Sequence, residues 1–283
     1  MKILGIESAS MVASVAVATE AGLLAEYTVD FKKTHSQTLL PMIDEITRMV
    51  GLDLETIDAI AVSAGPGSFT GLRIGSATAK GIGLALQKPL ISVPTMDAMA
   101  YGLYGTSALI CPIRDARRQQ VYTGLYHFER EFEVVMPQCA MDIRELIREL
   151  DRRGERVIFL GDGVPVLKEV IAQELRAPYD FAPLHVCRQR AASVAALGCV
   201  YLAEGRTQTA EEHVPEYLKK AQAERELEEA KRQGKMGELA AGHSVGVGDT
   251  ADTESRAGAA EAAGAGSGRA ARPGPGSASS GRS

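Results

Sequence analysis

The chain has 283 residues, a formal net charge of -5 and a sequence pI of about 5.7. Its composition, 45% hydrophobic and 24% charged, is typical of a globular protein. The acidic balance argues against a protein that holds nucleic acid by charge alone, and no apolar run reaches the roughly 18 residues that a membrane span needs. Four scattered cysteines without a C-x-x-C pair favour reduced thiols, and therefore the cytoplasm.

The first half of the chain reads as short strands followed by helical patterns. Leu39, Ile43 and Ile46 recur at helical spacing, and Gly51 is a natural stop for that helix. Strands are predicted at residues 2–8, 14–20, 23–29 and 58–65, and helices at 34–51 and 70–86.

The second half repeats this order of elements. Strands are predicted at residues 108–116, 120–128, 131–137 and 156–165, and helices at 141–154, 164–175 and 193–205. Three meandering strands followed by β-α-β steps indicate a mixed sheet flanked by helices, and here the pattern occurs twice. We therefore predict an α/β fold with an N-terminal lobe at 1–105 and a C-terminal lobe at 106–220. Residues 221–283 are first charged and then rich in Ala, Gly and Ser, a composition that predicts a disordered tail.

The segment SAGPGSFTGLRIG, residues 63–75, is rich in glycine and opens the second predicted helix. It lacks the lysine and the spacing of a Walker phosphate loop, and it misses the dinucleotide fingerprint by one residue. A helix N-terminus can still hold an anion, and the end of the first strand adds a carboxylate and hydroxyls. A structural turn with Ser68 or Thr70 as the cap explains the same pattern. The candidate nucleotide- or anion-binding residues are Glu7, Ser8, Ser10, Gly67, Ser68 and Arg73.

Small residues recur at every fourth position of the same helix: Gly71, Gly75, Ala79 and Gly83. Residues four apart share one face, so this face is nearly flat and lets another element approach closely. Tight packing inside the chain and docking of a partner are equally compatible with it.

The run RDARR lies between two predicted strands of the second half. Arg114, Arg117 and Arg118 could contact RNA phosphate or a nucleotide, or belong to a solvated loop. His35 has no second histidine at ligand spacing, so no metal site is predicted. The five histidines lie far apart, and no arrangement of an independent catalyst is recognisable.

Five segments, in this order, resemble the bacterial TsaB (YeaZ) family. They are ILGIESAS, HSQTLLP, SAGPGSFTGLRIG, PIRDARRQQVY and VPEYLK, and the resemblance covers about residues 1–220. It implies a duplicated actin-like, ribonuclease-H-like ATPase fold. It also implies a cytoplasmic subunit that does not catalyse alone but pairs with its homologue TsaD and works with the ATPase TsaE. The complex transfers a threonylcarbamoyl group to the N-6 amine of the adenosine beside the anticodon in certain tRNAs.

The resemblance further implies that the first two helices form the subunit interface, with a homodimer through the same surface when the chain is alone. The chain would contact tRNA only indirectly, through the complex. ATP and a metal would be used by the partner subunits rather than bound by this chain. Mapped onto the sequence, the interface residues are His35, Leu39, Ile43, Ile46, Thr70, Gly71, Gly75, Ala79 and Gly83. Three alternatives stay open: a stand-alone ATP-dependent kinase of the same fold, a glycoprotease-like metalloprotease, and a module that binds tRNA directly.

Overall fold

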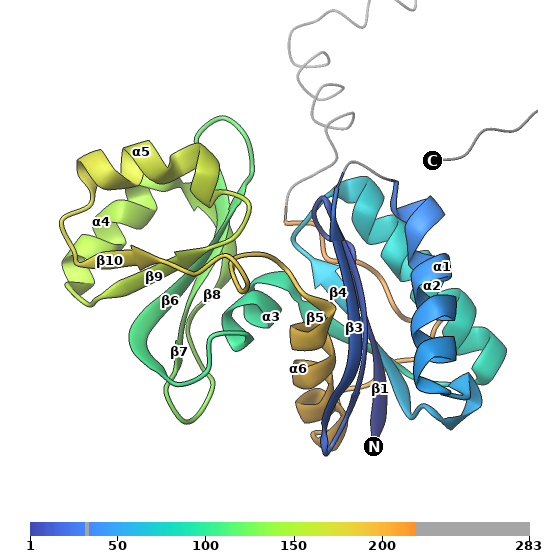
Figure 1. Ribbon diagram of the computed structural model, residues 1–283. Helices are drawn as coiled ribbons and strands as arrows, with labels where there is room; N and C mark the ends of the chain where they lie inside the picture. The colour runs from blue at the N-terminus through green and yellow to red at the C-terminus, as the bar shows by residue number, and fades with distance from the viewer. Residues whose placement is uncertain (32–33, 219–283) are drawn as a thin grey trace, which may run out of the picture. The chain divides into compact units, whose positions relative to one another are not determined.

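The computed structural model describes residues 1–31 and 34–218 (Figure 1). The strands are β1 (Lys2–Glu7), β2 (Val12–Thr19), β3 (Gly22–Asp30), β4 (Ala59–Gly65), β5 (Leu90–Pro94), β6 (Thr106–Asp115), β7 (Gln120–Phe128), β8 (Glu133–Asp142), β9 (Val157–Leu160) and β10 (Tyr179–Phe181). The helices are α1 (His35–Val50), α2 (Phe69–Leu86), α3 (Thr95–Tyr101), α4 (Ile143–Arg153), α5 (Val164–Glu174) and α6 (Ala191–Ala203), with a 3-10 turn at Leu54–Thr56. The predicted tail, 221–283, lies outside the described residues.

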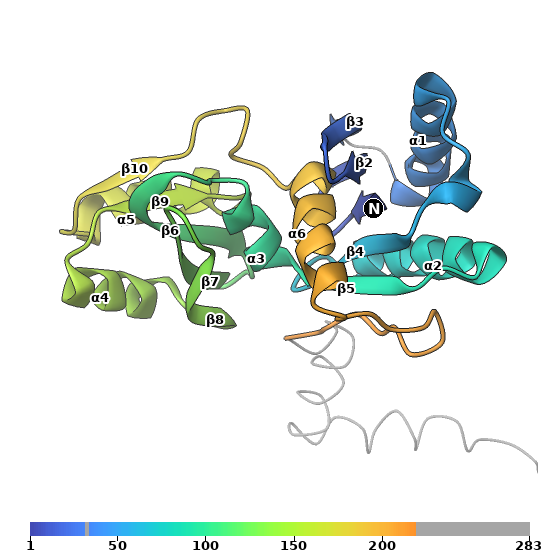
Figure 2. The same cartoon turned by 90° about the horizontal axis from the view of Figure 1, so that it is seen from below.

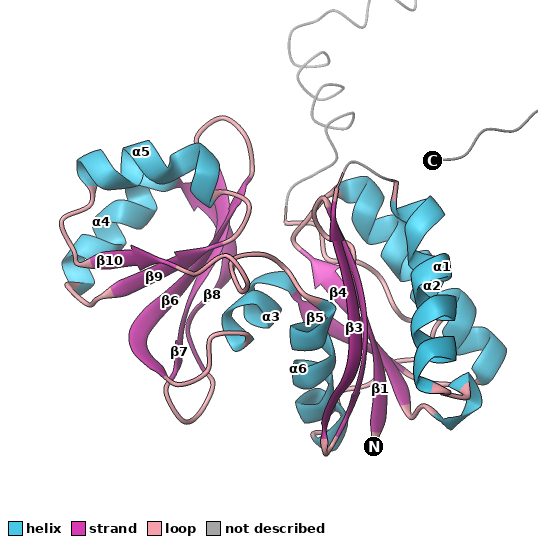
Figure 3. Cartoon of the chain, in the orientation of Figure 1, coloured by secondary structure: helices cyan, strands magenta, loops and turns pink. Residues whose placement is uncertain are grey.

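The two halves of the chain build the same sheet twice (Figure 3). The strand order is β3-β2-β1-β4-β5 in the first sheet and, in the matching direction, β8-β7-β6-β9-β10 in the second. In each sheet the first three strands are antiparallel neighbours and the last two pair in parallel. The predicted duplication is confirmed, and the fold is the duplicated actin-like α/β architecture. Among the described residues, no helix combines the length and the apolar character needed to cross a membrane.

Helices cover both faces of each sheet (Figure 2). Helices α1 and α2 pack on one face of the first sheet and α6 on the other, each over a separate apolar core. Helices α4 and α5 cover one face of the second sheet, and α3 lies against β6 and β7 on the other. Helix α3 also contacts α6. The apolar core beneath α6 on the first sheet therefore adjoins the core beneath α3 on the second sheet.

Helix α6 belongs to the first sheet, although the sequence interpretation placed it in a lobe spanning 106–220. It packs against β1, β2 and β4 through small residues on both sides. A Cβ atom on Gly5 would lie 2.6 Å from the Ala191 carbonyl oxygen, and one on Gly198 would lie 2.6 Å from the Ala61 Cβ. Close approach of this helix therefore depends on glycine at both positions.

The small-residue face of α2 turns inward, onto the first sheet. Gly71, Gly75, Ala79 and Gly83 are buried, and a Cβ atom on Gly75 would overlap the Ser8 Oγ. Of the two readings of this face, tight packing inside the chain is the one the structure shows. The prediction that these four residues form a subunit interface is therefore wrong.

The predicted interface residues of α1 are also internal. Leu39, Ile43 and Ile46 are at most 3% exposed and lie in the core with the first sheet, because the apolar stripe of an amphipathic helix covers its own sheet. His35 is buried as well, and its Nε2 lies 2.7 Å from the Ser10 carbonyl oxygen. Thr70 is the only exposed residue of the nine predicted ones.

A C-terminal strap, residues 207–218, crosses back over the first lobe. Its Gln208 exchanges two backbone hydrogen bonds of 2.9 Å with Leu90, and its Glu216 N–H donates to the Ala64 carbonyl at 2.6 Å. From β8, the Gln138 side-chain amide donates to the Gly65 carbonyl at 3.1 Å and to the Glu216 carboxylate at 2.8 Å. Because the Lys80 ammonium of α2 also donates to the strap's His213 carbonyl at 2.9 Å, the strap joins α2, β4 and β5 to β8 of the second sheet.

Candidate functional site

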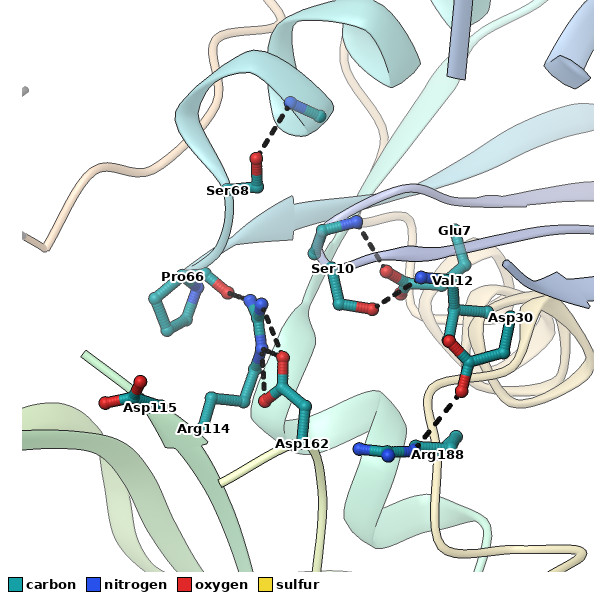
Figure 4. Close-up of polar contacts among 12 residues, drawn as sticks. Glu7, Ser10, Val12, Asp30, Pro66, Ser68, Arg114, Asp115, Asp162 and Arg188 are labelled. Carbon is teal, nitrogen blue, oxygen red and sulfur yellow. Dashed lines mark hydrogen bonds and ion pairs between the residues drawn. The ribbon is translucent and has the colours of Figure 1, made fainter. Parts of the chain in front are cut away.

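Strand ends from both halves converge on one cavity of about 620 Å³. In open α/β sheets, ligand sites form at the carboxyl ends of parallel strands. Here the loops after β1, β4, β6 and β9 meet (Figure 4). The cavity is lined by Ser10, Met11, Pro66, Gly67, Ser68, Phe69, Arg114, Asp115, Ala116, Arg117, Tyr122, Asp162, Val166, Glu216, Tyr217 and Leu218.

Arg114 links the chain segments that line this cavity. It is 6% exposed; its Nε and Nη2 donate to the Asp162 carboxylate at 3.1–3.3 Å, and its Nη1 donates to the Pro66 carbonyl at 3.0 Å (Figure 4). A planar guanidinium can hold a carboxylate and a carbonyl at once, which an ammonium cannot do with the same geometry. Arg114 was predicted as a possible RNA or nucleotide contact. The structure instead shows Arg114 buried and linking β6 and the loop after β9 to the turn after β4, and its contact with RNA or a nucleotide stays a prediction.

Glu7, at the end of β1, is a buried acid close to Arg114. It is 1% exposed, and its carboxylate accepts a hydrogen bond from the Ala9 N–H at 2.6 Å. Burial raises the pKa of Glu7 to about 7, although the Ala9 hydrogen bond and the nearby Arg114 charge act in the opposite direction. The side chain therefore exchanges a proton near neutral pH.

We expect Glu7 to make the fold less stable as pH rises. Its folded-state pKa lies above the ordinary value of 4.5, so the folded chain binds more protons between pH 4.5 and about 7, and the free energy of unfolding falls across that window. The Glu7→Gln variant keeps an acceptor for Ala9 and removes this titration. Relative to wild type, it should gain up to about 3 kcal/mol between pH 4.5 and 8, measured by urea unfolding.

The difference between the two proteins isolates Glu7 from other buried groups. Burial lowers the pKa of His213 to about 4, which gives a slope of opposite sign, but this contribution is the same in both proteins. Glu129→Gln, at an exposed position in the turn between β7 and β8, is the matched control and should show no such gain. Equal pH dependence of wild type and Glu7→Gln would contradict the assignment.

Three backbone N–H groups of the glycine-rich loop donate hydrogen bonds inside the chain. The Ser68 N–H donates to the Ala9 carbonyl at 2.7 Å, the Gly71 N–H to the Ser68 side chain at 3.2 Å, and the Leu72 N–H to the Ser68 carbonyl at 2.8 Å. Ser68 is therefore the N-cap of α2, as one of the two sequence readings proposed. A Cβ atom on Gly67 would lie 2.6 Å from the Ala9 carbonyl oxygen. Glycine at this position therefore lets the loop after β4 pass close to the loop after β1.

The two serines after β1 are engaged in the same way. The Ser8 hydroxyl donates to the Gly71 carbonyl at 2.9 Å, and the Ser10 hydroxyl accepts from the Val12 N–H at 3.1 Å. The Ser8 hydroxyl and the Ser68, Gly71 and Leu72 amides, which could have bound a nucleotide phosphate, therefore already donate to partners in the chain. No group of three or more His, Cys, Asp or Glu placed to hold a metal ion occurs within residues 1–31 and 34–218.

Of the remaining predicted residues, Arg117 lines the cavity, whereas Arg73 and Arg118 are not among its lining residues. Arg73 stacks on Phe69, 3.9 Å from the ring centroid, and Tyr217 of the strap lies against the same ring, 5.0 Å between centroids. Arg117 is exposed and pairs with Asp115 at 3.3 Å. Arg118 is exposed as well, and both arginines have a positive φ. The structure therefore separates Arg117 and Arg118 from the buried Arg114.

Sequence reasoning missed Asp162 and the aromatic pair of Phe69 and Tyr217. Asp162 follows β9 just as the glycine-rich loop follows β4, so the internal duplication is the signal that could have revealed it. The strap residue Tyr217 is 144 positions from its hydrogen-bond partner Arg73. No local sequence pattern predicts a contact over such a separation.

Comparison with known proteins places this architecture in a family. The family model described as TsaD, tRNA N6-adenosine threonylcarbamoyltransferase, matches residues 23–227. A Bacillus subtilis protein named tRNA threonylcarbamoyladenosine biosynthesis protein TsaB is 31% identical over 227 residues, 79% of this chain and 96% of that relative. The chain belongs to the TsaB family. An Escherichia coli protein of the same name is 30% identical over 230 residues, covering 77% and 95% of the two chains.

A solved structure agrees with the TsaB assignment. YeaZ from Pseudomonas aeruginosa is 26% identical and superposes with a TM-score of 0.65, covering 77% of this chain and 99% of that one. The match spans nearly the whole of that neighbour, so both sheets of the TsaB fold are shared.

Proposed function

We propose that this TsaB family member is an accessory subunit that pairs with a catalytic homologue of the TsaD family. The complex would support transfer of a threonylcarbamoyl group to the N-6 amine of the anticodon-adjacent adenosine in tRNA. The observation that carries the proposal is the 31% identity over 96% of a relative named for tRNA threonylcarbamoyladenosine biosynthesis. TsaE as a further partner, and a homodimer of the chain alone, belong to the same proposal.

The cavity supports a non-catalytic role. Its buried arginine is hydrogen-bonded to Asp162 and Pro66, and the Ser68, Gly71 and Leu72 N–H groups of the glycine-rich loop donate inside the chain. Catalytic phosphate handling requires donors that are free to meet the charge that develops in the transition state. ATP and a metal would accordingly be used by the partner subunits.

The surface that we propose for the partner is the outer face of α1 and α2, in place of the buried faces that the sequence suggested. An α1–α2 groove of about 380 Å³ lies there, without a charged side chain in its lining. Leu40 at its edge is 56% exposed, and Leu84 on the outer side of α2 is 54% exposed. Exposed apolar surface of this kind is typical of an interaction site. The groove is lined by Leu40, Leu54, Ala77, Thr78, Gly81, Ile82, Ala85 and Leu86.

Gly81 allows a sharp test of this surface. A Cβ atom there would meet nothing within 4 Å, so Gly81→Leu fills the groove without touching the core. We expect the variant to fold normally and to bind the cognate TsaD at least about tenfold more weakly, a loss of about 1.4 kcal/mol. Sedimentation of the full-length chain mixed with TsaD measures this, with threonylcarbamoyladenosine content of cellular tRNA as the functional readout.

Glu169→Leu on α5 is the matched control, because it adds leucine to an exposed helix position in the second lobe. It should leave TsaD binding unchanged. Undiminished binding by Gly81→Leu would remove the groove from the interface. Normal threonylcarbamoyladenosine in cells that lack the chain would refute the function as a whole.

A further inference from the structure

An arginine-lined groove lies on the second lobe, between α4 and the end of α5, away from the strand ends that form the cavity. The groove has a volume of about 550 Å³. Arg144, Arg148 and Arg152 follow one another at every fourth residue of α4, which spaces them about 6 Å apart along the helix axis and keeps them on one side. The α4–α5 groove is lined by Arg144, Ile147, Arg148, Asp151, Arg152, Glu174 and Arg176.

The two carboxylates of the groove are already engaged. Asp151 accepts the backbone N–H groups of Arg176 and Ala177, both at 2.8 Å, and so fixes the chain that carries Arg176. Glu174 accepts from the Arg144 Nε at 3.1 Å. Four guanidinium groups therefore face two carboxylates, both already hydrogen-bonded, and the groove is positive although the chain as a whole is acidic.

Two of the arginines have unspent donors. Arg144 is held by Glu174 and Gln119, and Arg152 by Glu149. Arg148 and Arg176 are exposed, and within the described part of the chain no hydrogen bond or ion pair of either guanidinium is found. A guanidinium carries five N–H donors in a planar fork that matches the oxygens of a phosphate group.

We propose that the α4–α5 groove binds the phosphate backbone of a helical RNA, an inference that rests on the proposed function and names a contact surface for its tRNA. A protein partner would need apolar or aromatic anchors, and the one apolar lining residue, Ile147, is 4% exposed. Single-stranded RNA would need aromatic platforms for its bases, and none lines the groove. Phosphate contacts from arginine, without base reading, are the way proteins hold helical RNA.

The test is salt-dependent binding of an unmodified tRNA transcript to the full-length chain, followed by fluorescence anisotropy. Each phosphate contact that is lost lowers the slope of log K against log salt by about one. The double variant Arg148→Ala with Arg176→Ala should therefore lower the slope by about two. A control that removes two positive charges elsewhere, Arg130→Ala with Lys88→Ala, should keep the wild-type slope.

Several outcomes would overturn the proposal: no salt-dependent binding by the wild type, an unchanged slope in the double variant, or an equal loss in the control. Polyglutamate is included as a probe for an acidic protein partner. Arginine-dependent binding of polyglutamate, with none of the transcript, also rejects an RNA site. Co-sedimentation with TsaD is read separately on the same samples, so that failure of the groove is distinguished from failure of the accessory role.

Discussion

Replacing Gly75 with alanine is expected to lower the free energy of unfolding by about 1–3 kcal/mol. The new methyl group would overlap the Ser8 Oγ, and the Ser8 Cβ would lie 3.2 Å away, so α2 has to move off β1. The loss comes despite the gain of about 0.5–1 kcal/mol that alanine normally brings to a helix interior. Equilibrium urea unfolding of the full-length chain measures the change.

Gly81→Ala is the matched control, on the same helix and with the same added methyl group. Its Cβ meets no atom within 4 Å, so the variant should gain about 0.5–1 kcal/mol. If Gly75→Ala were as stable as wild type but failed to bind TsaD, the small-residue face would be a subunit interface after all. The paired result therefore separates internal packing from docking.

Removal of the Asp162 carboxylate should have the second large effect. Asp162→Ala leaves Arg114, whose side chain is 8% exposed, without its ionic partner. An unpaired buried charge costs about 3–5 kcal/mol, and the lower end applies here because Asp162 itself is 32% exposed and water can reach the vacated position. Urea unfolding at neutral pH measures the loss.

Arg117→Ala supplies the contrast, because it breaks an ion pair of the same neighbourhood whose arginine side chain is 87% exposed. That change should cost no more than about 1 kcal/mol. The double variant Arg114→Leu with Asp162→Leu should recover part of the stability lost in Asp162→Ala, since it leaves no isolated charge. Equal losses of stability in Asp162→Ala and Arg117→Ala would show that the buried Arg114–Asp162 pair does not stabilise the fold as we describe.

The long periodic elements of this fold could be predicted because each covers its own sheet. The helices at 34–51 and 141–154 correspond to α1 and α4, and the repeated element order corresponds to the repeated sheet. Three short elements were missed: β5 has five residues, α3 seven and β10 three, too few for a period to emerge.

The sequence could not predict whether the small-residue face of α2 points into the chain or toward a partner. Gly71 and Gly75 create a flat face in either reading, since close approach to a sheet of the same chain and to a foreign helix need the same small residues. The tertiary fold decides between them by placing Ser8 directly against the stripe. The partners of Arg114 could not be predicted for a related reason: Asp162 and Pro66 are each 48 residues away, on separate loops.

The position of α6 has a consequence for how the protein is made. One face of the first sheet is complete only when residues 191–203 cover Ile3, Ile91 and Val93, yet β5 ends at Pro94. At 5–20 residues per second, synthesis of the intervening roughly 100 residues takes on the order of 5–20 s. During that time the nascent chain carries an apolar sheet face that its own C-terminal half has not yet covered. A ribosome-associated chaperone would find its target there, in the lobe that emerges first and is finished last.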